Sequence, residues 1–131
     1  MKKNNYIYIS GKVPSFNKMI DATKGKWGGY YRIKKYWTKR VHDAVIRSSI
    51  SIDEFPIFLE ITWVEANRRR DPDNIAYSIK FILDGFVAAS IMPSDSWKYI
   101  KGWVSKFAVY PAIDNPIKIP AKYGIIVRIL T

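Results

Sequence analysis

The sequence contains no cysteine and only one histidine, His42. Without cysteine the protein has no disulfides, no cysteine-ligated zinc, no iron–sulfur cluster and no thiol catalysis. Any metal ion must therefore be held by oxygen ligands. We interpret His42 as an ordinary helix residue rather than a general base, because a single histidine without a sequence partner carries little signal.

Long apolar runs are also missing. No segment approaches the ~18 consecutive apolar residues of a membrane span, and the apolar stretch after the polar start is too short for a secretory signal. We therefore expect a cytoplasmic protein with no membrane partner. A length of 131 residues suits one core, so we expect a single domain over residues 1–131.

Negative charge is scarce. There are 11 acidic residues against 22 lysines and arginines, which gives a net charge of +11. Such a surface repels itself and would be neutralised by a polyanion, so nucleic acid is the leading partner. The alternative is a basic protein that is merely well solvated. The many aromatic residues are expected mostly in the core, although such rings also stack on unpaired bases.

Apolar patterning predicts alternating strands and helices. Runs rich in β-branched and aromatic residues predict strands, and apolar residues at helical spacing predict amphipathic helices. The predicted strands are residues 6–10, 55–65, 97–109 and 124–130, and the predicted helices are residues 36–49 and 72–87. This order favours an α+β (mixed α/β) fold, a single two-layer domain with one mixed β-sheet packed against two helices.

Residues 21–35 are rich in lysine, glycine and tyrosine and show little periodicity, which predicts a mobile basic loop. Such a loop could close over a phosphate backbone. The candidate DNA-binding residues of this segment are Lys24, Lys26, Arg32, Lys34 and Lys35.

The segment after the second predicted strand carries the most information. In an extended chain, residues two apart point to the same side, so Asp71 and Asp73 could aim both carboxylates into one pocket. Two carboxylates so near each other repel unless a cation lies between them. Mg²⁺ and Mn²⁺ are suited to such oxygen ligands. The alternative is that both residues only cap a helix, since aspartate favours helix starts in any protein.

A polar column on the following helix extends this candidate site. At 100° per residue, Asp73, Lys80 and Asp84 fall on one side of a continuous helix. Lys80 could then stabilise charge at a scissile phosphate or protonate a leaving group. The alternative is a surface ion pair between Lys80 and Asp84 worth only ~0.3–0.5 kcal/mol.

Three consecutive arginines, Arg68, Arg69 and Arg70, directly precede the acidic pair. Their guanidinium groups could grip the phosphates that flank a cleaved bond. The alternative is that they neutralise Asp71 and Asp73 in the free protein. The two roles could coexist.

Together these residues resemble the core signature of the RusA family of Holliday junction resolvases. The matching segments are Arg68-Arg69-Arg70-Asp71-Pro72-Asp73-Asn74, Lys80, Leu83-Asp84-Gly85, Ser94-Asp95 and, near the start of the chain, Pro14-Ser15-Phe16-Asn17. The similarity spans residues 11–107. In shorter members the lysine lies one helical turn beyond the Asp-Asn pair, where this chain has Tyr77 or Ser78, and the loop often carries two adjacent acids where this chain has Ser94-Asp95.

The resemblance implies a metal-dependent endodeoxyribonuclease that resolves four-way DNA junctions in recombination and repair. It implies that Asp71, Asp73 and Asp95 bind Mg²⁺, that Lys80 assists catalysis, and that Asp84 and Asn74 support the site, with Asn17 among the DNA contacts. It also implies a RusA-like fold and a homodimer of phage or prophage origin in a bacterial host, and no small-molecule cofactor is expected. Two alternatives remain: a non-enzymatic basic DNA-binding protein, or a nuclease for other branched or single-stranded nucleic acid.

Overall fold

The computed structural model describes residues 5–25, 28–111 and 122–131. Its elements in chain order are β1 (Tyr6–Ser10), α1 (Phe16–Thr23), α2 (Gly29–Ser48), β2 (Ile57–Glu65), α3 (Pro72–Ala76), α4 (Ile79–Ala88), β3 (Ile100–Val109) and β4 (Gly124–Leu130). The predicted α+β class is confirmed, because one mixed sheet packs with helices around a single core.

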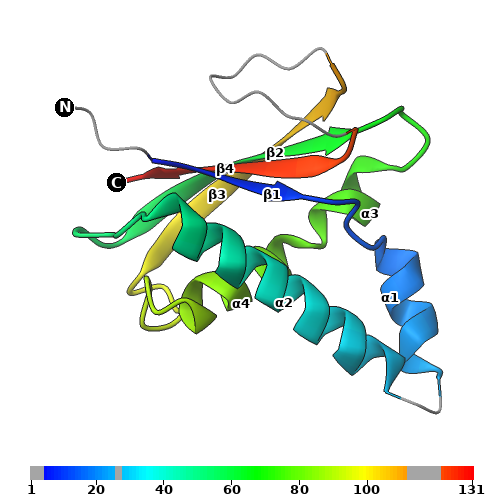
Figure 1. Cartoon of the computed structure of the whole chain (residues 1–131), viewed down its shortest axis with the longest axis horizontal. Coiled ribbons are helices and arrows are strands. Elements are labelled where there is room, and N and C mark those ends of the chain that lie inside the picture. Colours follow the sequence, from blue (N-terminus) through cyan, green and yellow to red (C-terminus); the bar gives the residue numbers. More distant parts are fainter. Residues whose placement is uncertain (1–4, 26–27, 112–121) are drawn as a thin grey trace.

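The sheet has the strand order β1-β4-β2-β3 (Figure 1). Strand β4 runs antiparallel to both β1 and β2, whereas β2 and β3 are parallel. Along β2, Leu59, Ile61 and Trp63 are fully buried and alternate with half-buried Glu60 and Thr62. This alternation defines the face of the sheet that carries the core.

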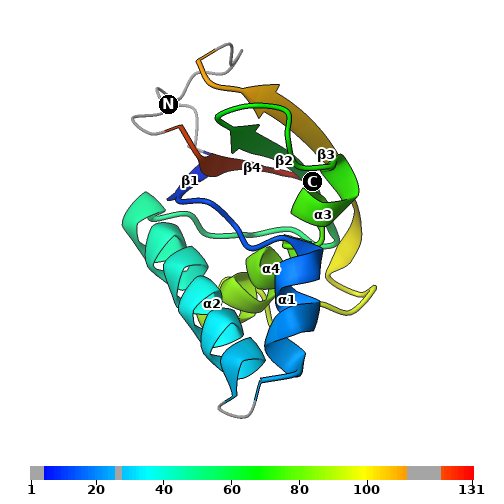
Figure 2. The same cartoon turned by 90° about the vertical axis from the view of Figure 1, so that its right-hand side faces the viewer.

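Helices α2 and α4 lie on one side of the sheet in both cartoon views (Figures 1 and 2). They approach each other closely at Gly85, where a Cβ atom would overlap the side chain of Val41 on α2. Helices α1 and α3 lie side by side, and the rings of Phe16 and Tyr77 join them with centroids 4.8 Å apart.

The prediction of a basic loop over residues 21–35 is wrong for most of that segment. Ser15 accepts a hydrogen bond from the backbone N–H of Lys18 and so caps α1. Helix α2 begins at Gly29, seven residues earlier than the predicted helix, after Gly28 with φ of 67°. The glycines therefore separate two helices, and Tyr30 and Ile33 pack against the core. Lys26 lies outside the described residues.

The predicted second helix is two helices. The backbone N–H groups of Ser78, Lys80 and Phe81 each bond to the carbonyl three residues earlier, so the chain tightens between α3 and α4. Ser78 is fully buried, and its hydroxyl donates to the carbonyl of Pro14 at 3.2 Å. This contact with the segment before α1 explains why the regular helix does not continue.

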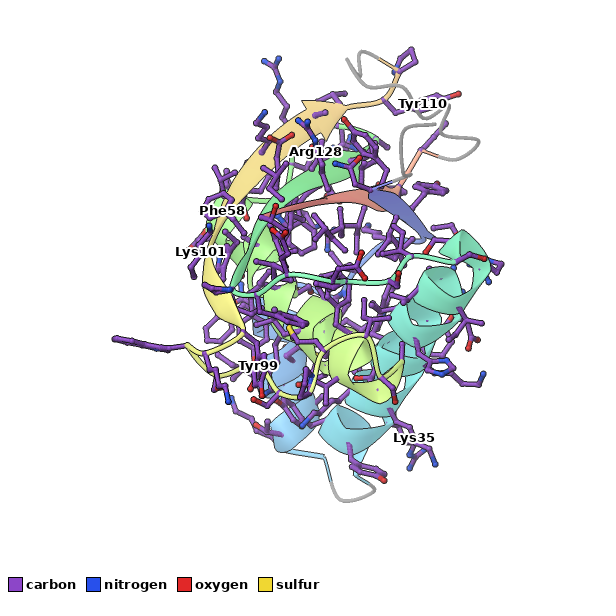
Figure 3. The ribbon with its side chains drawn as sticks, turned by 90° about the vertical axis from the view of Figure 1, so that its left-hand side faces the viewer. Lys35, Phe58, Tyr99, Lys101, Tyr110 and Arg128 are labelled. Atoms are coloured by element: carbon purple, nitrogen blue, oxygen red, sulfur yellow. The ribbon has the colours of Figure 1, made fainter. Side chains whose placement is uncertain are left out.

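Strand β3 forms an edge of the sheet, and its aromatic residues are more exposed than predicted. Trp103 and Phe107 are 46% and 43% exposed, and Trp97, in the loop before the strand, is 94% exposed. Figure 3 shows this edge strand, with Tyr99 and Lys101 near the start of β3, and Lys35 projecting from α2.

Candidate functional site

Asp71 occupies the N-cap position of α3 without capping it. Its backbone is extended, with φ of −71° and ψ of 145°, and its carbonyl accepts the backbone N–H of Ile75 at 3.2 Å. Its side chain makes no capping hydrogen bond. The carboxylate is exposed and does not cap the helix, in contrast to the alternative that Asp71 serves only as a cap.

Asp73 lies in the first turn of α3 and is also exposed. The alternation argument does not apply to this pair, because Asp71 is extended whereas Asp73 is helical. Among the described residues, neither carboxylate has a hydrogen bond or an ion pair. Both remain available to an external ligand at the start of the same short helix.

The three arginines divide into two groups. Arg68 and Arg69 are exposed, and the backbone N–H of Arg69 donates to Asn67 Oδ1 at 3.0 Å. Within the described parts of the chain no arginine forms a salt bridge with Asp71 or Asp73. The alternative that the arginines neutralise the acidic pair thus finds no contact in support.

Arg70 is committed to the fold. Its Nε and Nη2 atoms donate to the two carboxylate oxygens of Glu65, both at 2.7 Å, and its Nη1 donates to the carbonyl of Val13 at 2.6 Å. The Arg70 and Glu65 side chains are only 18% and 8% exposed. Together with the bond from Ser78 to Pro14, this ion pair fixes the segment before α1 against both ends of α3.

Asp95 lies in the loop after α4 and is exposed. It lines a groove of about 510 Å³ whose other walls include Leu83, Trp97, Lys101 and Trp103. In residues 5–25, 28–111 and 122–131, no three aspartate, glutamate, histidine or cysteine side chains form a group that could hold a metal ion. The three predicted ligands are therefore not gathered into one preformed site.

Lys80 is separated from Asp73 by the turn between α3 and α4, so the predicted continuous polar column is interrupted. Lys80 Nζ lies 3.9 Å from Asp84 Oδ2, and Lys34 Nζ on α2 lies at the same distance from that atom. The oxygen is buried and accepts no hydrogen bond from the part of the chain that the structure describes. Asp84 thus sits between two cations at the contact of α2 and α4.

The other predicted DNA-binding residues lie on or beside the first two helices. Asn17 is exposed on α1, Lys24 caps the end of that helix, and Arg32 and Lys35 are exposed on α2. Asn74 is half-buried in α3.

His42 is a half-exposed helix residue whose Nδ1 lies 2.8 Å from Asp43 Oδ1. Lys39 donates to the other oxygen of Asp43 at 2.9 Å. The hydrogen bonds with His42 and Lys39 hold the pKa of Asp43 below its usual value. This group belongs to α2 and does not include the acidic pair.

Sequence reasoning missed several residues that hold the site together. The sequence does not predict the structural contacts of Glu65, Tyr77 and Ser78, because nothing near them in the sequence indicates their distant partners. The pKa of Tyr77 is raised, first by its hydrogen bond with Tyr30 and then by burial. Tyr77 packs against Phe16 and Ser78 donates to the carbonyl of Pro14, so both side chains have structural contacts.

The donor chemistry of Asp71 and Asp73 fits a hard divalent cation. Both carboxylates are exposed and uncommitted, and Mg²⁺ commonly uses one or two carboxylates together with water and substrate phosphates. A group of three ligands is therefore not required before substrate binds. The residues present fit Mg²⁺ or Mn²⁺ through this pair.

None of the helices described in residues 5–25, 28–111 and 122–131 is both long and apolar enough to span a membrane. Comparison with known protein families, with curated proteins and with solved structures finds no match to the chain. The similarity to the RusA family therefore rests on the motif residues alone and stays a prediction.

Proposed function

We propose that the chain is a metal-dependent endodeoxyribonuclease that resolves four-way DNA junctions. The observation that carries the proposal is the pair of exposed carboxylates on Asp71 and Asp73, which bind nothing else among the described residues. Exposed Arg68 and Arg69 lie just before them in the chain, in a protein with a net charge of +11. Carboxylates beside uncommitted cations suit metal-assisted cleavage of a phosphodiester.

In this proposal Asp71 and Asp73 would hold Mg²⁺ or Mn²⁺. Asp95, which forms no group with them among the described residues, is not one of the ligands. When bound, the metal would supply Lewis-acid assistance to hydrolysis of the phosphodiester. Arg68 and Arg69 hold the phosphates that flank the cut, for which planar guanidinium groups are well shaped. Lys80 assists the departing oxygen, since its side chain is 46% exposed and its Nζ lies as far as 3.9 Å from Asp84 Oδ2.

A homodimer would match the substrate. A four-way junction has approximate twofold symmetry, and a symmetric dimer would present two equivalent sites for paired nicks on opposing strands. We place the protein in the cytoplasm of a bacterial host, encoded by a phage or prophage, on the strength of the motif resemblance alone.

The test is cleavage of a labelled four-way junction and of a matched linear duplex, each with Mg²⁺ or EDTA. We expect symmetric nicking of the junction that requires Mg²⁺. Asp73→Asn should lose cleavage and keep DNA binding, because it removes a metal ligand without reducing the positive surface. The matched control is Asp21→Asn, which removes an exposed carboxylate from α1 and should cleave as the unmodified protein does.

The alternatives predict different results. Binding without cleavage under any divalent metal would contradict the nuclease and favour a non-enzymatic DNA-binding protein. Metal-dependent cleavage of flaps or single strands in preference to the junction would keep the metal site and reject junction resolution. If Asp73→Asn and Asp21→Asn lose cleavage equally, then the acidic pair has no specific role in cleavage.

A further inference from the structure

A second basic site lies between the segment before α1 and the two first helices. A pocket of about 560 Å³ is lined by Lys12 from that segment, Lys18 from α1, and Arg32 and Arg40 from α2. Among the described residues that line it, none is acidic. Lys12, Lys18 and Arg40 therefore bring positive charge from three parts of the chain to one pocket.

Arg40, one of the residues that line this pocket, is held by several hydrogen bonds. Its Nε and Nη2 atoms donate to the carbonyl of Ser10 at 3.1 and 2.6 Å, and Nη2 also reaches Ser10 Oγ at 2.7 Å. Its Nη1 donates to the hydroxyl of Tyr36 at 3.2 Å, and the guanidinium lies over the rings of Tyr36 and Trp37. The positive charge is therefore held in place before any ligand arrives.

The chain turns sharply to bring Lys12 to the rim. Gly11 has φ of 119°, and a Cβ there would lie 2.9 Å from Trp37 on α2. Only glycine allows this approach without strain. Lys12 and Lys18 are both exposed, and Lys12 Nζ lies 5.0 Å from the ring centroid of Tyr123.

The pocket and the acidic pair share one structural support. Lys12 and Pro14 line the pocket, while the carbonyls of Val13 and Pro14 accept the bonds from Arg70 and Ser78 that fix α3. A phosphate held in the pocket would thus keep a defined position relative to the carboxylates at the start of α3.

We infer that this pocket binds a backbone phosphodiester of the DNA strand away from the bond that is cut. The inference rests on the proposed function for the identity of the polymer, and the pocket itself is separate from Asp71, Asp73 and the arginine run. Its cations come from separate elements around an open pocket, and an open pocket can admit a phosphate that is part of a continuous DNA strand. Each lysine that neutralises a phosphate adds to the salt dependence of binding through counterion release.

The test measures junction binding in EDTA by fluorescence anisotropy across a series of salt concentrations. Lys12→Gln and Lys18→Gln should each weaken binding severalfold and lower the slope of log affinity against log salt by about 1. The matched control is Lys106→Gln, which removes the same charge from β3, where Lys106 pairs with Glu60 at 3.4 Å. It should leave the slope unchanged, and thermal unfolding should confirm that all three variants remain folded.

The outcomes separate this inference from the proposed function. Reduced slopes in the two pocket variants, in a protein that cuts no DNA, would support the pocket and overturn the nuclease. Intact cleavage with the same slope in Lys12→Gln, Lys18→Gln and Lys106→Gln would overturn the pocket and keep the nuclease. Saturation by inorganic phosphate at constant ionic strength, seen as amide shifts at Lys12 and Lys18, would identify a site for the free anion and overturn the phosphodiester assignment.

Discussion

Replacing Arg70 by methionine is expected to destabilise the protein far more than the same change at either neighbouring arginine. Arg70 makes two hydrogen bonds of 2.7 Å to Glu65 and one of 2.6 Å to the carbonyl of Val13. Glu65 is 6% exposed as a residue, so removal of its partner leaves a buried carboxylate without compensation.

The size of the effect follows from this burial. Breaking a buried ion pair from one side typically costs about 3–5 kcal/mol. Because the Arg70 side chain keeps 18% exposure, we expect the lower end, about 3 kcal/mol. With a urea dependence of about 2 kcal/mol per molar, the unfolding midpoint should fall by about 1.5 M.

Urea unfolding followed by circular dichroism measures this directly. Arg68→Met and Arg69→Met are the matched controls, since both side chains are exposed, and each should change the free energy of unfolding by less than about 0.5 kcal/mol. Replacing Glu65 by leucine together with Arg70→Met should recover part of the loss. If Arg70→Met costs no more than Arg68→Met, then the ion pair is not structural and the reasoning fails.

Two further predictions concern the helices. Gly85→Ala would normally favour a helix by up to about 1 kcal/mol, but its Cβ would overlap Val41, so we expect a loss of about 1–3 kcal/mol in thermal unfolding. The raised pKa of Tyr77 means that the folded state holds this phenol proton more tightly than the unfolded state. This contribution to the free energy of unfolding is present below pH 10 and is lost as the pH rises through the folded pKa. The difference in stability between the unmodified protein and Tyr77→Phe should therefore shrink above pH 10.

Both predictions have clear contrary results. A Gly85→Ala variant as stable as the unmodified protein would show that α2 and α4 are less closely packed than described. Adding Val41→Ala to Gly85→Ala should relieve the overlap, and no relief would point to another cause. A constant difference in stability between the unmodified protein and Tyr77→Phe from pH 8 to 11 would mean that the bond to Tyr30 does not shift the proton, whose usual pKa is 10.

The strands could be predicted from sequence because their signal is local. Strand β2 is an almost continuous apolar run, and its end at Glu65 was correctly placed. The same reasoning fails between residues 21 and 35, where the glycines predict a loop. Gly28 and Gly29 instead begin a helix, and the packing of its partly buried residues Tyr30 and Ile33 becomes clear only when the partner surface is known.

The candidate site was only partly predictable, for a related reason. Asp71 and Asp73 stand out by residue type, and the structure places both at the start of α3. Nothing in three consecutive arginines tells which one is buried, because the Val13 carbonyl that receives Arg70 lies 57 positions away. Likewise, the break before α4 depends on a bond from Ser78 to Pro14, 64 positions away.

The position of β4 sets the order in which the fold can assemble. The strand is the last element along the chain, yet it lies between β1 and β2 in the sheet. The side chain of Asn5, just before β1, donates to the carbonyl of Ile129, 124 positions later. During synthesis β1 must therefore wait for the final strand before its backbone N–H and C=O groups find their partners in the sheet. Such distant pairing favours slow folding and a nascent chain that depends on protection from aggregation until β4 has been made.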